Sequence, residues 1–317
     1  MKKYFAFCLN DKYFSFCYIT IFSILENKKA SDELAFHLLT DYLSKKDQKK
    51  FQDLVKQTND SVNIHYVDKV KFEGFNMNFS IYVWFRILIP EILDKSISKV
   101  LYLDCDVIVK SNLDELFNLD IQNKALAAVI DKQSFTDQTF ERLNYPKSKK
   151  YICAGVLLLN IDYWREHNIT QKIYNFGKRY PEKSVFAEQD AINYICQDSK
   201  MMLPLKFGVI NNFFSASYHY NEKEVLEAMN SPEIIHFAGN APWKYISNHH
   251  FHKKIWWTYK RRANLGLNNI NRNYIKSMLI YYLRVIKFFV LNFKPFPYRK
   301  PRTITNTQVL SSFKNRR

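Results

Sequence analysis

The chain has 317 residues, of which 47% are hydrophobic and 16% aromatic, so it can bury a full α/β core rather than remain disordered. Its net charge of +17 is unevenly spread, because residues 244–317 contain 17 of the 47 Lys and Arg residues and no acidic residue, whereas the preceding part is balanced. Five cysteines without CxxC spacing suit reduced thiols in the cytoplasm, and no uncharged apolar run is long enough to predict a membrane-spanning helix.

The first part of the chain alternates predicted strands and helices. Strands are predicted at residues 4–9, 34–39 and 62–67, a turn at 10–13, and helices at 14–26, 44–56 and 80–88. This order predicts a doubly wound, parallel sheet in which ligands bind beyond the carboxyl ends of the strands. Asn10 and Asp11 would lie at that edge.

The stretch at residues 99–109 carries the clearest chemical signal. Its apolar, β-branched residues predict a strand buried on both faces of the sheet, interrupted by Asp104 and Asp106. Burying ionised carboxylates is costly without a partner, and residues two apart in a strand point to the same side. The pair therefore predicts a site for a hard metal ion, with Cys105 turned into the core.

The pattern of the second part is less regular. Strands are predicted at 124–130, 156–160 and 234–237, helices at 162–180 and 188–196, and a polar loop at 131–150. The last strand would leave His236 close to Gly239. There are six glycines and neither GxGxxG nor GxxxxGK[ST] occurs, so a dinucleotide fingerprint and a P-loop are both excluded as motifs.

Several motifs in a fixed order resemble family 8 glycosyltransferases, a retaining group with the GT-A fold that includes bacterial lipopolysaccharide galactosyl- and glucosyltransferases. The resemblance spans residues 4–245. It rests on Asn10-Asp11-Lys12-Tyr13, Arg86, LYLDCDVIV at 101–109, Leu113-Asp114-Glu115-Leu116, CAGVLLLN at 153–160 with Trp164-Arg165, Glu188-Gln189-Asp190, and His236-Phe237-Ala238-Gly239 with Pro242-Trp243. It implies a mostly parallel central sheet with helices on both faces.

The resemblance also implies a role for each candidate site residue. Asp104, Asp106 and His236 would hold a divalent cation, for which Mn²⁺ suits the imidazole ligand better than Mg²⁺ does. Gln189, Glu188, Asp131 and Arg86 are the candidate catalytic residues, with Gln189 nearest the anomeric carbon. The nucleotide sugar would contact Cys8, Asn10, Asp11, Tyr13, Arg86, Asp104, Cys105, Cys153 and Gly239. Tyr13 can stack on uracil, and Asn10 can hydrogen bond to its edge.

Two positions depart from the family pattern. Cys153 stands where the family commonly has Asn before Ala-Gly, and Ala241 stands where it commonly has Lys before Pro-Trp. The first change removes or replaces a hydrogen bond to the sugar. The second removes a contact to the diphosphate, for which Lys244 is a candidate substitute. The donor, UDP-galactose, UDP-glucose or a related sugar nucleotide, therefore stays open.

The C-terminal residues 246–317 form a basic, aromatic tail beyond the catalytic domain, residues 1–245. The apolar run at 278–293 contains Arg284 and Lys287, so it predicts a segment that lies on an anionic membrane rather than one that crosses it. We expect a peripheral protein on the cytoplasmic face of a bacterial inner membrane, acting on a lipid-linked oligosaccharide of a lipopolysaccharide or lipooligosaccharide core.

Two alternative functions are weighed against this expectation. A strand that ends in Asp-x-Asp also opens the haloacid-dehalogenase type of phosphatase, although Ile108 and the position of the motif far from the N-terminus disfavour it. The basic tail alone would suit a nucleic-acid-binding protein, but we expect no nucleic-acid partner.

Overall fold

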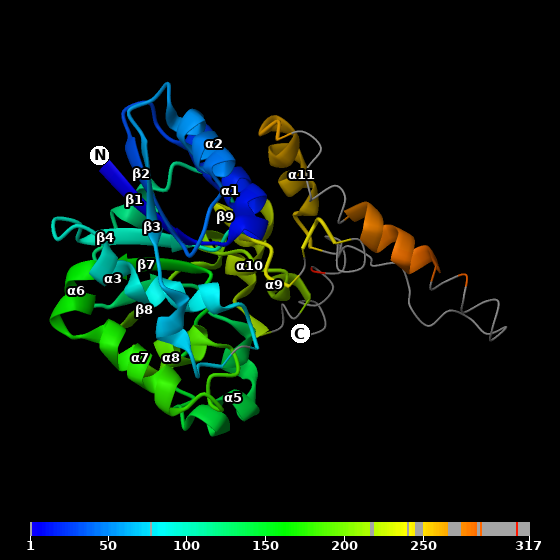
Figure 1. The fold of residues 1–317 in the computed structure, drawn as a ribbon. Helices are drawn as coiled ribbons and strands as arrows, with labels where there is room; N and C mark the ends of the chain where they lie inside the picture. Colours follow the sequence, from blue (N-terminus) through cyan, green and yellow to red (C-terminus); the bar gives the residue numbers. More distant parts are fainter. Residues whose placement is uncertain are drawn as a thin grey trace.

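The computed structural model describes residues 2–76, 78–215, 219–239, 241–244, 250–265, 274–283, 286 and 309 (Figure 1). The strands are β1 (Lys2–Cys8), β2 (Glu33–Thr40), β3 (Ser61–Tyr66), β4 (Lys99–Leu103), β5 (Val107–Val109), β6 (Leu126–Ala128), β7 (Val156–Asn160), β8 (Lys200–Met202) and β9 (Ile234–His236). The α-helices are α1 (Phe14–Asn27), α2 (Lys45–Val55), α3 (Ile89–Ile92), α4 (Asp114–Phe117), α5 (Asp137–Leu143), α6 (Ile161–Glu166), α7 (Ile169–Arg179), α8 (Glu188–Ile195), α9 (Asn212–Ser215), α10 (Glu222–Asn230) and α11 (Lys253–Arg262). The 3-10 helices are η1 (Asp11–Tyr13), η2 (Lys69–Phe72), η3 (Ile81–Leu88), η4 (Lys132–Phe135) and η5 (Leu205–Phe207).

A mixed, mostly parallel sheet forms the centre of the molecule. Among the described residues its strand order is β3-β2-β1-β4-β7-β6-β8. The strands from β3 to β4 are parallel, as predicted, whereas β7 runs antiparallel to both of its neighbours. The prediction of a wholly parallel sheet is therefore wrong at β7. The prediction of a mostly parallel sheet is confirmed.

Helices cover both faces of this sheet because side chains alternate along each strand. Phe5 and Phe7 of β1 face a hydrophobic cluster formed with α1, α2, α10 and α11. Ala6 and Cys8 face the opposite cluster, formed with η3, α3, α5, α6, α7 and α8. The two apolar layers explain why the strands read as nearly continuous hydrophobic runs.

The stretch at 99–109 is two strands rather than one, so the prediction of a single continuous strand is wrong. β4 belongs to the central sheet, while β5 pairs antiparallel with β9 in a separate two-stranded sheet. The chain changes sheet at residues 104–106, where the Asp104 amide donates to Gly155 O and the Asp106 carbonyl accepts from the Phe237 amide. The two carboxylates therefore sit on a turn between two sheets, beyond the carboxyl end of β4.

Two other predicted elements differ from the structure. The predicted polar loop at 131–150 contains η4 and α5, because Phe140 and Leu143 bury one side of a helix that ends at a left-handed Asn144. The predicted helix at 162–180 is divided into α6 and α7, since Asn168 also adopts the left-handed conformation (φ 51°). Asn is among the few non-glycine residues that accept this conformation readily.

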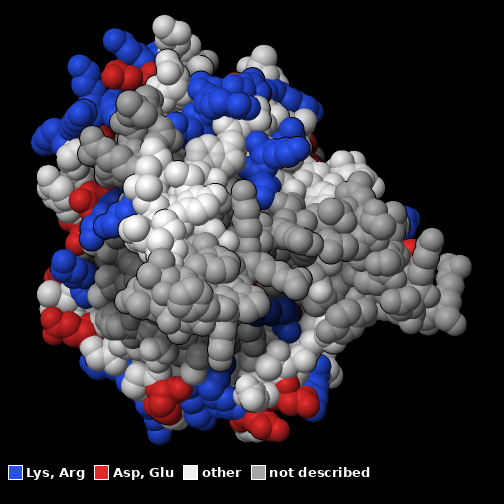
Figure 2. All heavy atoms as spheres, turned by 90° about the vertical axis from the view of Figure 1, so that its right-hand side faces the viewer, with Lys and Arg blue, Asp and Glu red and all other residues white. Residues whose placement is uncertain are grey.

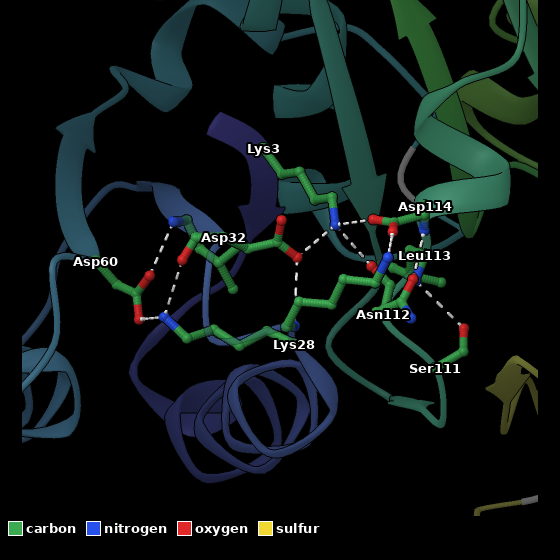
Figure 3. Close-up of polar contacts among 10 residues, drawn as sticks. Lys3, Lys28, Asp32, Asp60, Ser111, Asn112, Leu113 and Asp114 are labelled. Atoms are coloured by element: carbon green, nitrogen blue, oxygen red, sulfur yellow. Dashed lines mark hydrogen bonds and ion pairs between the residues drawn. The ribbon is translucent and has the colours of Figure 1, made fainter. Parts of the chain in front are cut away.

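The amino end of β1 is tied to the loop that follows β5 by buried charges, shown in Figure 3. The Lys3 ammonium, only 1% exposed, lies 2.6 Å from Asp32 and 2.5 Å from Asp114, and it donates to Asn112 O at 2.9 Å. Nearby, Lys28 pairs with Asp60 at 2.5 Å. Each buried charge thus has a partner, as burial requires.

Part of the predicted tail packs on the body of the protein. Trp256 of α11 is 1% exposed and contacts Phe16 of α1 and Trp243 through their rings. No helix in the described part of the chain is both long and apolar enough to cross a bilayer. Most of the predicted tail, including Arg284 and Lys287, lies outside the described residues.

Candidate active site

A pocket of about 360 Å³ opens beyond the carboxyl ends of β1 and β4. It is lined by side chains from β1, η1, η3, the turn at 104–106, α8 and the end of β9. Of the residues singled out from the sequence, the lining includes Cys8, Asn10, Tyr13, Arg86, Asp104, Cys105, Asp106, Asp131, Cys153, Glu188, Gln189, His236 and Gly239. Asp11 does not line it: this residue is exposed, and its carboxylate accepts from the Lys12 amide.

The predicted metal ligands come together in this pocket. His236 Nε2 lies 3.2 Å from an Asp106 oxygen and 3.5 Å from an Asp104 oxygen, and one ligand atom from each of the three residues falls within 4.8 Å of the others. Two carboxylates and one imidazole are a donor set that suits Mn²⁺ and accepts Mg²⁺ less well. The donor set therefore fits a divalent cation.

Gly155, directly before β7, makes this approach possible. A Cβ atom at position 155 would lie 2.1 Å from His236 Cε1 and 2.8 Å from an Asp104 oxygen. Any side chain there would occupy the space that the imidazole now fills. Glycine is required here for the close approach, and the φ angle of Gly155 is not in the left-handed region.

The imidazole of His236 and the carboxylate of Asp106 shift each other's pKa. Burial alone would lower the pKa of His236, but the Asp106 carboxylate raises it well above its usual value. Conversely, burial would raise the pKa of Asp106, and the imidazole of His236 lowers it. The two side chains thus attract each other across the 3.2 Å that separates His236 Nε2 from the Asp106 oxygen.

Arg86 links the metal-binding turn to α8. Its guanidinium is 3% exposed, lies 2.9 Å from Asp104 Oδ1 and 3.2 Å from Glu188 Oε1, and stacks 4.3 Å from the Tyr102 ring centre. Burial raises the pKa of Glu188 to about 8, because desolvation outweighs the attraction of the guanidinium. Glu188 Oε2 is buried and has no hydrogen-bond partner within the described protein, so it is available to a ligand in the pocket.

Gln189 is held at the start of α8 by contacts on both sides of its amide. Its Oε1 accepts from the Ala154 amide at 2.8 Å, and its Nε2 donates to the Tyr151 hydroxyl at 3.4 Å. Tyr151 in turn donates to Asp190, which Arg142 pairs in a bidentate contact. The carboxamide is therefore oriented by a buried network before any ligand binds.

Asn10 and Tyr13, from the turn that follows β1, also line the pocket. The Asn10 side-chain oxygen accepts from the Tyr13 amide at 3.1 Å, which leaves its NH₂ group for a ligand. Tyr13 is 46% exposed, a large fraction for an aromatic ring that lines a pocket. A flat open ring beside an amide donor has the form of a nucleobase site.

The two departures from the family pattern have different consequences. Cys153 Sγ lies 3.8 Å from His236 Nδ1, so a thiol occupies the far side of the ligand imidazole. At the second departure, Ala241 is buried, and Lys244, its candidate substitute, is exposed and does not line the pocket.

Asp131, a candidate catalytic residue, has two roles in the structure. It lines the pocket, and its carboxylate also caps η4 by accepting a hydrogen bond from the Gln133 amide.

Sequence reasoning missed some of the residues that shape the site. Tyr102 donates to Asp104 Oδ1 at 2.7 Å, and the aromatic rings of Phe79 and Phe186 line the pocket. Tyr102 lies two residues before Asp104 in the predicted strand, so the period of two placed it on the same side as the acidic pair. Nothing in the sequence pattern pointed to Phe79.

The sequence from residue 4 to residue 247 matches the protein family described as Glycosyl transferase family 8. The chain belongs to this family. A glycosyltransferase is thus the enzyme class that the chain represents, and the phosphatase alternative has no support. A relative of similar length is general stress protein A of Bacillus subtilis, 24% identical over 277 residues that cover 84% of this chain and 96% of the relative.

Relatives that are named for an activity are also similar. Lipopolysaccharide 1,3-galactosyltransferase of Salmonella typhimurium is 27% identical over 244 residues, 74% of this chain and 71% of that protein. Glycosyltransferase GlyB of Streptococcus pneumoniae is 33% identical over 205 residues, 62% of this chain, but the match spans only 47% of GlyB. Among solved structures, galactosyltransferase LgtC in complex with donor and acceptor sugar analogues superposes with a TM-score of 0.75 at 20% identity, covering 86% of this chain and all of LgtC. This likeness confirms the predicted GT-A fold.

Proposed function

We propose that this protein is a metal-dependent, retaining hexosyltransferase that uses a UDP-sugar. The observation that carries the proposal is the meeting of Asp104, Asp106 and His236 in one pocket that is also lined by the exposed ring of Tyr13, the amide of Asn10, and Glu188 and Gln189. Such a lining offers groups suited to a base, a diphosphate and a sugar. Relatives named as lipopolysaccharide galactosyl- and glucosyltransferases support a hexose as the transferred group.

The nucleotide end would be bound by stacking and hydrogen bonding. Tyr13 would stack on uracil, and the free NH₂ group of Asn10 would donate to its edge. The divalent cation held by Asp104, Asp106 and His236 would neutralise the charge that develops on the diphosphate leaving group. Arg86 keeps Asp104 in place by its ion pair, so it acts on the diphosphate through the turn at 104–106.

Two residues of α8 bear on how a retaining reaction would proceed. Glu188, whose raised pKa keeps its carboxyl neutral at pH 7, would donate from Oε2 to a sugar hydroxyl. Gln189 has its Oε1 occupied by the Ala154 amide, and an amide oxygen is a weak nucleophile. We therefore favour attack by the acceptor on the same face as the departing diphosphate over a covalent intermediate on Gln189.

A screen of UDP-sugars with Mn²⁺, Mg²⁺ or EDTA tests this proposal. We expect turnover of UDP-galactose or UDP-glucose only with a divalent ion, with Mn²⁺ the better, and loss of at least 100-fold in Asp106→Asn, as removal of a metal ligand requires. The control is Asp120→Asn, an exposed acidic residue outside the pocket. Equal rates in EDTA, or full activity of Asp106→Asn, would exclude the metal-dependent reaction.

The proposal also covers the acceptor and a contact with the membrane. We propose a lipid-linked oligosaccharide acceptor, approached by a protein that lies on the cytoplasmic face of the bacterial membrane through residues 246–317. The described helix at 274–283 supports this, because Leu279 and Leu283 are 54% and 64% exposed. In Figure 2, which faces the side of α11, Lys and Arg side chains gather near the upper part of the surface. Basic and exposed apolar side chains together suit an anionic interface.

Vesicle sedimentation of the full chain tests the membrane contact. We expect binding to vesicles that contain anionic phosphatidylglycerol and weak binding to purely zwitterionic vesicles. The double variant Leu279→Glu with Leu283→Glu should lose binding by more than tenfold, because each buried Leu contributes about 1.5–3 kcal/mol. Val70→Glu, at a residue 58% exposed on η2, is the matched control. Equal binding of the double variant would place the contact elsewhere.

A further inference from the structure

The short strand β5 has an unusual neighbour on one of its edges. One edge pairs with β9, and the other edge faces the helix α1 rather than a strand. All three residues of β5 are fully buried, so the amides and carbonyls on the second edge have no access to water. Buried backbone groups of this kind must find partners elsewhere in the protein.

Three polar side chains of α1 supply those partners. The Thr20 hydroxyl lies 2.8 Å from both the Cys105 carbonyl and the Val107 carbonyl, and shares its proton between them. The Ser23 hydroxyl accepts from the Val109 amide at 3.0 Å. The Asn27 amide donates to the Val109 carbonyl at 3.1 Å.

The spacing of these side chains is what a helix needs to follow a strand. Positions 20, 23 and 27 fall on one side of α1, because residues three and four apart share a helix face. Thr20 and Ser23 are fully buried within an otherwise apolar helix. Burying hydroxyl groups in such a helix is unfavourable unless they are hydrogen bonded, which indicates that the bonds to β5 account for these residue types.

The contacts begin at the metal-binding turn itself. Thr20 holds the carbonyl of Cys105, the residue between the ligands Asp104 and Asp106. The other side of the turn is fixed by the Phe237 amide, which donates to the Asp106 carbonyl, next to His236. The turn is thus held by hydrogen bonds from α1 on one side and from the end of β9 on the other. Only β9 carries the third candidate ligand, His236.

We propose that Thr20, Ser23 and Asn27 are positioning residues that hold the metal-binding turn, residues 104–106, by fixing the free edge of β5 against α1. The proposal rests on the proposed function only in that the turn is taken to hold a metal ion. Lys3 anchors the other end of the same segment through Asn112 O (Figure 3). The segment from residue 105 to residue 112 is therefore restrained along its whole length by side chains remote from the pocket.

The test compares Thr20→Val, which removes the hydroxyl at nearly constant volume, with Thr20→Ser, which keeps it. The matched control is Thr40→Val, because Thr40 is also fully buried and donates to one carbonyl, that of Tyr42, at 2.8 Å. Mn²⁺ affinity is measured by electron paramagnetic resonance titration of the full chain. We expect the Kd to rise about tenfold in Thr20→Val, which corresponds to about 1.4 kcal/mol. It should stay within threefold of the wild type, roughly 0.7 kcal/mol, in Thr20→Ser and Thr40→Val.

Hydrogen exchange of the metal-free protein is the second readout, because it does not depend on metal binding. We expect faster exchange at residues 104–110 in Thr20→Val and in Ser23→Ala, and an unchanged rate there in Thr40→Val. Ser23→Ala serves where Thr20→Val does not fold, since it removes the acceptor of the Val109 amide and, besides this, only a hydrogen bond to the Thr20 carbonyl within α1. If the wild type bound no Mn²⁺, the metal part of the proposed function would fail. The hydrogen-exchange rates would then be the test of the positioning role. Unchanged exchange in both variants, or wild-type Mn²⁺ affinity in Thr20→Val, would overturn the positioning role.

Discussion

The substitution Gly155→Ala gives the most direct test of how the ligand group is assembled. The added methyl group would lie 2.1 Å from His236 Cε1 and 2.7 Å from His236 Nδ1, far inside the ordinary contact limit of 3.4 Å. The imidazole must therefore move by about 1 Å. The new methyl group would also lie 2.8 Å from an Asp104 oxygen, so it would crowd two of the three candidate ligands.

The size of the effect follows from this displacement. Overpacking of a buried site costs about 1–3 kcal/mol of stability, and a misplacement of about 1 Å at a reacting centre costs about 100-fold in rate. We expect Gly155→Ala to weaken Mn²⁺ binding by at least about tenfold and to lower kcat/KM by about 100-fold. Isothermal titration with Mn²⁺ and steady-state kinetics with the best UDP-sugar measure the two effects separately.

The control separates a local effect on the ligands from simple overpacking. In Gly177→Ala the new methyl group would lie 2.5 Å from Phe75 and 2.7 Å from Trp84, in the hydrophobic cluster and away from the pocket. This variant should lose a similar amount of stability in chemical denaturation but keep its metal affinity. If Gly155→Ala bound Mn²⁺ as tightly as the wild type, or if both variants lost affinity equally, the reasoning from the His236 contact would be refuted.

Further expectations concern Glu188 in the pocket and His37, a buried histidine that does not line it. Glu188→Gln should keep activity at pH 7 within about tenfold of the wild type, because the Glu188 carboxyl, with a pKa of about 8, is already neutral at that pH. Glu188→Ala should lose about 100-fold in activity. Activity assays of both variants over pH 6–9 test this difference. Glu188 should also lower the free energy of unfolding as the pH rises from 4.5 toward 8, because over that range the unfolded chain releases the carboxyl proton and the folded chain keeps it. In urea denaturation, the free energy of unfolding of Glu188→Gln should therefore decrease less over that range than that of the wild type. Burial lowers the pKa of His37 to about 4, so the unfolded chain binds a proton first as pH falls below 6.5. The free energy of unfolding should then decrease between pH 6.5 and 4 by up to about 3 kcal/mol, and by less in His37→Gln. An equal decrease in wild type and variant would assign the loss to other groups.

The order and kind of most core elements were predictable because local pattern and tertiary role agree. β1, β2, β3, α1 and α2 carry strong periodicity and clear ends, and each lies within one or two residues of its predicted range. The errors fall where a tertiary contact overrides the local pattern. The apolar residues at 99–109 read as one strand, yet the chain leaves the sheet at residue 104 because backbone groups of Gly155 and Phe237, remote in sequence, capture those of Asp104 and Asp106.

The same reasoning explains which site residues could be identified from the sequence. Charged residues inside apolar runs are conspicuous, and Arg86, Asp104 and Asp106 all lie in the pocket for the reason that made them conspicuous: each is buried or partly buried with an opposite charge. Asp11 follows β1 as predicted but lies on an exposed turn outside the pocket lining, where an acidic residue needs no partner beyond a neighbouring amide, so its contact with a nucleotide sugar stays a prediction.

Residues that act by leaving space or by holding the backbone could not be identified in this way. Gly155 is one glycine among six, and only the position of His236 shows why its missing side chain matters. Thr20 and Ser23 look like minor polar interruptions of an apolar helix until the free edge of β5 is seen beside them. The candidate metal ligands are thus conspicuous side chains, whereas their geometry depends on a glycine and on side chains that bond to the edge of β5 not paired with β9. A sequence pattern records the first kind of information directly and the second only through the three-dimensional pairing of distant segments.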